Sequence, residues 1–270
     1  MDIFLYVVIF IIGTLFGSFF TLAVYRIPLK KDITHERSYC PNCNHKLSFL
    51  DMIPIFSYLF LGGKCRYCKQ KIRPRYLLLE ILSGVVFVLF AMSIKMSIFT
   101  LDISKLVYFV FTLLYFVTLF ILAGIDKEKR KLEKSVLLFG YIIETLYIIY
   151  LYIVEKDPNI YRYVIYLSII CILMLLDILV LRRKVKDSYP IEILLLCMLL
   201  LVYTYEAVTI LTITFTLVVI GIYGVMKKIT NYSKKSVQKV LEKNNVQPIA
   251  FYLCVTNIIC FIIANYYIFK

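Results

Sequence analysis

Long apolar runs, separated by short polar loops, constrain the fold of this chain more than any other feature. A helix needs about 20 apolar residues to cross a bilayer, and helices are the usual way to satisfy the backbone there. The runs are Ile3–Tyr25, Tyr76–Met96, Leu106–Ile125, Ser135–Ile153, Tyr163–Leu181, Ile191–Thr204, Ala207–Val225 and Pro248–Phe269. The run that begins at Ile191 is the shortest. We therefore expect an all-α, polytopic membrane protein of about eight transmembrane helices, with seven as the fallback.

The composition excludes most soluble classes of protein. Hydrophobic residues make up 61% and charged residues 18% of the 270 residues, whereas a soluble domain has about 45–50% and about 25%. A disordered chain, a disulfide-rich miniprotein and an ordinary soluble enzyme are therefore excluded. The net charge of +14 comes from bases that lie in short loops between the apolar runs. This arrangement indicates a membrane topology with lipid as the surrounding partner, and no nucleic acid.

The distribution of Lys and Arg predicts the orientation of the spans. Arg26–Arg75 carries eleven of these residues, and the next loop has only Lys95 and Lys105. Strongly and weakly basic loops alternate along the rest of the chain, and basic loops face the cytoplasm. We expect a multi-pass protein of the cell (inner or cytoplasmic) membrane with both termini outside. The predicted division is a first transmembrane helix at residues 1–25, a cytoplasmic loop at 26–75 and a membrane-embedded helical domain at 76–270.

The cytoplasmic loop carries two C-x-x-C pairs, Cys40 with Cys43 and Cys65 with Cys68, separated by 21 residues. This spacing is typical of a zinc ribbon, in which four thiolates form a closed tetrahedral shell. A closed shell has no open position for chemistry, so we expect a structural Zn²⁺ in a zinc-ribbon-like loop. The alternative is four free or disulfide-paired cysteines, although disulfides are rare in the cytoplasm. His45 lies close enough to serve as a substitute ligand.

The segment from Gly17 to Gly84 closely resembles the N-terminal part of bacterial prepilin peptidases, the type IV leader peptidases and N-methyltransferases. The matching motifs are Gly17-Ser18-Phe19, Arg26-Ile27-Pro28, Cys40-Pro41-x-Cys43, Asp51-Met52-Ile53-Pro54, Ser57-Tyr58-Leu59, Gly63-Lys64-Cys65-Arg66-x-Cys68, Arg75-Tyr76 and Glu80-x-x-x-Gly84. Thr21 stands where the family usually has Asn. The resemblance implies a membrane-embedded aspartyl peptidase domain at 76–270 and S-adenosylmethionine as the methyl donor. It also implies type IV prepilins or pseudopilins as substrates.

The resemblance places the first catalytic aspartate at Asp126, at the end of an apolar run. The family's second aspartate lies in a G-x-G-D motif, and this chain has no Gly-Asp dipeptide. A gap-free placement puts Glu192 at that position, with Tyr189 and Ile191 in place of the two glycines. Asp187 is the other candidate. Two close acids share one proton, so that one acts as base and the other as acid.

The function expected from this resemblance is cleavage of a prepilin leader at the cytoplasmic face, followed by N-methylation of the new N-terminus. Because G-x-G-D is absent, two alternatives stay open. One is a cleavage-deficient relative that binds pilins or only methylates them. The other is a zinc-bearing membrane scaffold of a pilus, secretion or competence apparatus.

Overall fold

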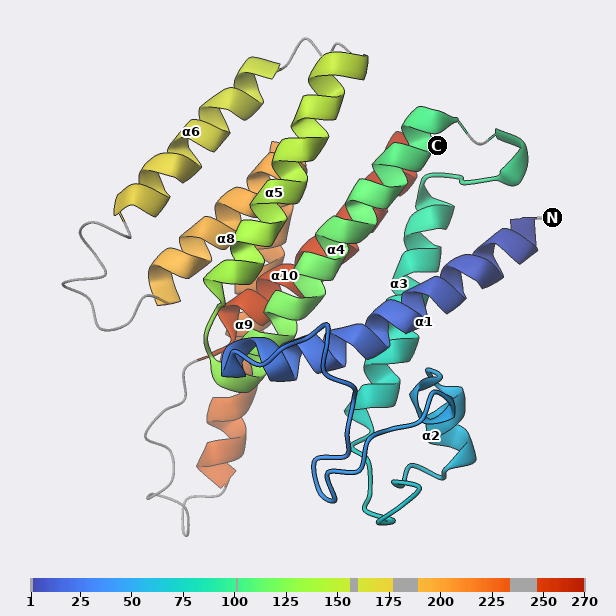
Figure 1. The fold of residues 1–270 in the computed structure, drawn as a ribbon. Coiled ribbons are helices and arrows are strands. Elements are labelled where there is room, and N and C mark those ends of the chain that lie inside the picture. The colour runs from blue at the N-terminus through green and yellow to red at the C-terminus, as the bar shows by residue number, and fades with distance from the viewer. Residues whose placement is uncertain (1, 101, 156–159, 177–188, 234–246, 270) are drawn as a thin grey trace. The chain divides into compact units, whose positions relative to one another are not determined.

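The computed structural model describes residues 2–100, 102–155, 160–176, 189–233 and 247–269 (Figure 1). Within these ranges the regular structure is helical, apart from two isolated β-bridges in the cysteine loop. The long helices are α1 (Asp2–Arg26), α3 (Arg75–Ser93), α4 (Ile103–Lys129), α5 (Lys134–Tyr150), α6 (Ile160–Leu176), α8 (Tyr189–Tyr203), α9 (Glu206–Ser233) and α10 (Ile249–Ile268). Helix α2 (Phe56–Phe60) is a short helix in the cysteine loop. The predicted all-α fold is confirmed.

Six of the described helical segments are long and apolar enough to cross a membrane: α1, α3, α4, α9, α10, and α5 together with the π-helical turn that follows it, Lys134–Val154. Helices α6 and α8 are apolar but shorter. The apolar run at Ile191 was expected to be short, and α8 has 15 residues. Each predicted apolar run thus contains a described helix. The end of the run at Leu181 lies outside the described residues.

The chain divides into two compact units, Met1–Val117 with Ile262–Lys270, and Thr118–Phe261. Helices α4 and α10 each contribute residues to both units. The division predicted from the sequence, at residues 25 and 75, stays a prediction.

In the first unit, small residues let α1 and α3 approach closely. A Cβ added at Gly17 would lie 2.7 Å from Glu80 Cα, and one added at Gly13 would lie 2.7 Å from Gly84 Cα. Ser83 Oγ donates a hydrogen bond to Gly13 O at 2.7 Å across the same contact. Close packing through small residues is a common way for helices to associate in lipid, where the hydrophobic effect does not drive them together.

We expect Gly17→Ala to destabilise the protein by about 1–3 kcal/mol, because the new methyl group would meet the α3 backbone and force the helices apart. The matched control is Gly221→Ala in α9, where an added Cβ meets nothing within 4 Å. Alanine favours a helix over glycine by up to about 1 kcal/mol, so the control should be neutral or stabilising. Thermal unfolding in detergent, followed by circular dichroism, measures both. Equal melting temperatures for the two variants would contradict the packing argument.

In the second unit, α8 packs against α5 and α6 (Figure 1). Tyr141 Oη of α5 donates to Leu195 O of α8 at 2.6 Å. Between α9 and α10, Thr216 and Thr256 share a hydrogen bond of 2.7 Å. Such bonds between helices satisfy polar groups that have no water inside a bilayer.

Candidate functional site

The cysteine loop contains two equivalent knuckles, 25 residues apart. In the first, Cys40 N donates to His45 O and Asn44 N donates to Cys40 O; in the second, Cys65 N donates to Gln70 O and Lys69 N to Cys65 O. An antiparallel bridge closes each knuckle, Tyr39 with Lys46 and Lys64 with Lys71. The residues after the second cysteines, Asn44 and Lys69, both have positive φ, at 55° and 59°. Each knuckle therefore turns tightly enough to present both of its thiols on one side.

The two knuckles bring the four predicted ligands together. The Sγ atoms of Cys40, Cys43, Cys65 and Cys68 all lie within 4.8 Å of one another, and those of Cys40 and Cys68 are 3.9 Å apart. A tetrahedral Zn²⁺ with Zn–S bonds of about 2.3 Å places its sulfurs about 3.8 Å apart. The donor set and its spacing therefore fit this metal.

The surroundings of the cluster favour a thiolate at one of the four positions. The N–H of Gln70 and then the side-chain amide of Asn42 hydrogen bond to Cys68 and lower the pKa of this thiol to about 6. The thiolate is the form that binds a metal. His45 is not a member of the cluster; its ring contacts that of Tyr67 in a tilted arrangement, with the centroids 3.5 Å apart.

Buried charged residues connect the loop to the helices that flank it. The Arg26 guanidinium, at the end of α1, donates to the backbone carbonyls of Asp32, Glu36 and Arg37. Arg26 is only 2% exposed, and these bonds order the first part of the loop. Burial acts to raise the pKa of the Asp51 carboxyl. Hydrogen bonds from Ser48 and from Arg66, the latter at 2.7 Å, outweigh this effect and hold the pKa below its usual range. Asp51 thus joins the segment before α2 to the second knuckle.

Glu80 of α3 fixes the start of α2. Its Oε2 accepts a hydrogen bond from the N–H of Ile55 at 2.8 Å, and the Ser18 side chain of α1 also bonds to it. Ile55 has a φ of 63°, a strained value for a β-branched residue. The buried carboxylate compensates for this strain and joins α1, α2 and α3 at one point. Glu80 is part of a motif found in the sequence, but the spacing of the motifs does not predict that Glu80 is bonded to Ile55.

Asp126 lies in the last turn of α4 and is fully buried. Its Oδ1 accepts a hydrogen bond from Tyr189 Oη at 2.7 Å, and its Oδ2 accepts one from Phe251 N at 2.9 Å. Phe251 is in the first turn of α10, where backbone N–H groups have no partner within the helix. Both carboxylate oxygens of Asp126 are thus held in place by donors from two other helices.

Glu192 lies in the first turn of α8 and is 3% exposed. Its Oε2 accepts a hydrogen bond from Leu132 N at 3.3 Å, in the turn that follows α4. Tyr189 precedes Glu192 by three residues on the same helix, so both side chains project from one face of α8. The structure therefore brings Asp126 and Glu192 to the same end of the second unit, with Tyr189 bonded directly to Asp126. Asp187 lies outside the described residues.

Two further residues bear on this site. The family resemblance places Tyr189 at the position of a glycine, yet its hydroxyl donates a hydrogen bond to Asp126. Its position one turn before Glu192 was the available signal. Glu144 in α5 is 1% exposed, and among the described residues neither of its carboxylate oxygens has a hydrogen-bond partner. It belongs to the second unit, and within the described part of the chain no hydrogen bond joins it to Asp126.

A known family model matches the N-terminal part of the chain. The model of the bacterial peptidase A24 N-terminal domain matches residues 11–94. Residues 11–94 are therefore similar to this domain, and we refer to them as the A24 domain. The expected resemblance to prepilin peptidases is confirmed, and the A24 domain contains the four clustered cysteines, Asp51 and Glu80.

Proteins similar to this chain are named prepilin leader peptidase/N-methyltransferase. That of Klebsiella pneumoniae is 39% identical over 87 residues, 30% of this chain and 38% of that protein. That of Myxococcus xanthus is 41% identical over 81 residues, 30% of this chain and 24% of that protein. That of Bacillus subtilis is 34% identical over 113 residues, 40% of this chain and 46% of that protein. The chain therefore matches less than half the length of these relatives. No solved structure matches it.

Proposed function

We propose that this protein is a membrane-embedded prepilin peptidase that removes the leader of type IV prepilins or pseudopilins and then N-methylates the new N-terminus. The proposal combines the A24 domain with one structural observation. This observation is the pair of buried acids, Asp126 and Glu192, at one end of the second unit. The site would face the cytoplasm, where the basic loops are expected.

The arrangement suits hydrolysis of a peptide bond by two acids. One carboxylate takes a proton from water as the water attacks the scissile carbonyl carbon, and the second, protonated acid donates to the departing amine. Asp126 would be one of these acids and Glu192 the other. Tyr189 and the N–H of Phe251 would keep the Asp126 oxygens in a fixed orientation, which matters because small displacements of reacting groups slow catalysis strongly.

The two expected cofactors differ in how well they fit the described residues. Zn²⁺ fits the four cysteines and would hold the two knuckles together. S-adenosylmethionine would supply the methyl group, but the pocket of the A24 domain does not suit it. That pocket, of about 350 Å³, is lined by Lys64, Lys71 and Arg73 and by no acid, and these cations would repel a sulfonium group. We therefore assign no step of methylation to this pocket.

Purified protein in liposomes, supplied with a cognate prepilin and S-adenosylmethionine, tests the proposal. Mass spectrometry of the pilin is expected to show loss of the leader and then one added methyl group at the new N-terminus. An intact leader after prolonged incubation would overturn the peptidase assignment. If a pre-cleaved pilin were nevertheless methylated, the protein would be a methyltransferase without cleavage.

A further inference from the structure

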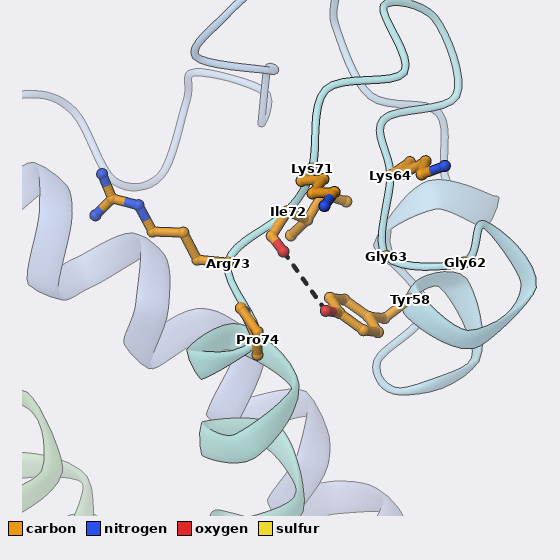
Figure 2. Close-up of a pocket in the computed structure, with 8 residues that line it drawn as sticks. All are labelled: Tyr58, Gly62, Gly63, Lys64, Lys71, Ile72, Arg73 and Pro74. Atoms are coloured by element: carbon orange, nitrogen blue, oxygen red, sulfur yellow. Dashed lines mark hydrogen bonds between the residues drawn. The ribbon is translucent and has the colours of Figure 1, made fainter.

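The A24 domain exposes a group of large apolar side chains around α2. Phe56 is 60% exposed, Leu59 61% and Phe60 86%, and the preceding turn exposes Phe49 at 75% and Leu50 at 63%. Tyr58 of the same helix instead lines the pocket (Figure 2). We call Phe49, Leu50, Phe56, Leu59 and Phe60 the apolar patch. The rings of Phe56 and Phe60 lie together, with centroids 6.5 Å apart, and exposed groups of large apolar side chains often mark interaction surfaces.

The depth of α2 relative to the membrane follows from its contact with α3. Ile55, which directly precedes α2, is bonded to Glu80, five residues inside α3 from Arg75. At 1.5 Å per residue this is about 7.5 Å along the helix axis. Helix α3 has 19 residues, so its length of about 28 Å matches the hydrocarbon core of about 30 Å. Arg75 then lies near the boundary of the hydrocarbon, and α2 begins below the level of the headgroups.

The pocket beside α2 is lined by basic side chains, in contrast to the apolar patch. Figure 2 shows Lys71 and Lys64 on adjacent loop segments of the second knuckle, with Arg73 and Pro74 leading into α3. Lys64 and Lys71 are bridge partners, and like charges placed opposite each other are unfavourable. In the described part of the chain no ion pair involves Lys64, Lys71 or Arg73. Lys64 and Lys71 would attract an anion on this side of the pocket, whereas the Arg73 side chain extends away from them on the other side (Figure 2).

We propose that the A24 domain binds the bilayer surface through α2. The apolar patch lies among the acyl chains, and the pocket lined by Tyr58, Lys64, Lys71 and Arg73 takes the phosphate of an anionic lipid. Apolar side chains below a layer of basic residues are the usual arrangement of a segment that lies in the membrane interface. We assign lipid and not a protein as the occupant because the bond from Ile55 to Glu80 holds the start of α2 at the depth of the acyl chains.

The chain contains no tryptophan, so a single introduced tryptophan reports its own surroundings. Phe60→Trp, in nanodiscs, is expected to give blue-shifted emission that is quenched by brominated lipid and protected from iodide. The matched control is His35→Trp, in a polar turn of the same loop where the side chain is 88% exposed, and it is expected to show the reverse pattern. Emission of Phe60→Trp that is quenched by iodide, and is protected only when prepilin is added, would overturn the proposal in favour of a substrate-docking surface.

A comparison of how strongly the protein retains anionic and neutral lipids tests the pocket separately from the apolar patch. Native mass spectrometry of detergent-purified protein should show retained phosphatidylglycerol but little phosphatidylcholine. Lys64→Gln/Lys71→Gln/Arg73→Gln should lose this preference several-fold, while Lys46→Gln on the first knuckle should keep it. Equal retention of the two lipids by the unsubstituted protein would overturn the anion site. Because neither readout requires cleavage, the proposal stands or falls independently of the peptidase assignment.

Discussion

Asp126→Asn is expected to abolish cleavage of a prepilin, with a loss of at least about 10²–10⁴-fold in rate. The amide is nearly the same size as the carboxyl, and its oxygen can still accept the hydrogen bond from Tyr189. It can neither share a proton with a second acid nor take one from water. Cleavage is measured by mass spectrometry of the pilin N-terminus, and thermal unfolding checks that the variant is folded.

Three further variants separate the roles of the neighbouring groups. Glu192→Gln should also lose cleavage, because it removes the second acid. Tyr189→Phe removes only the 2.7 Å bond to Asp126 and should reduce the rate without abolishing it. Asp187→Asn should leave cleavage intact. Full activity of Asp126→Asn would refute the assignment of this acid, and loss in Asp187→Asn but not in Glu192→Gln would place the second acid at Asp187.

Cys43→Ser/Cys65→Ser is expected to lose the bound metal. Unsubstituted protein should contain about one Zn per chain, and the double variant, which removes one ligand from each knuckle, should contain almost none. Because metal binding and folding of such a site are coupled, the loop between Arg26 and Arg75 should also become sensitive to protease. Elemental analysis and limited proteolysis measure the two effects.

Cys171→Ser is the matched control for this experiment. Cys171 lies alone in α6 and is exposed, so its loss should change neither the zinc content nor the resistance of the loop. Zinc that is missing from the unsubstituted protein, or that is retained fully by the double variant, would contradict the proposed metal site.

The positions of the helices and of the metal ligands could be predicted because their signals are local. A run of about 20 apolar residues indicates a span wherever the rest of the chain lies, and each C-x-x-C pair forms its own knuckle within a few residues. The two candidate catalytic carboxylates were harder to predict. Asp126 was placed through the family resemblance, whereas Glu192 depended on an alignment through a motif without its glycines, and its catalytic role stays a prediction.

The sequence by itself determined the helical class, the order of the apolar spans and the four-cysteine cluster, because each depends on composition or on neighbours along the chain. Tertiary structure alone decided that Tyr189 bonds to Asp126 across 63 residues, and that Glu80 holds Ile55 across 25 residues. Those contacts depend on which helix faces meet and at what depth. A buried carboxylate bonds to whichever donors the packing of the helices brings within reach, and the spacing of residues along the chain does not specify that packing.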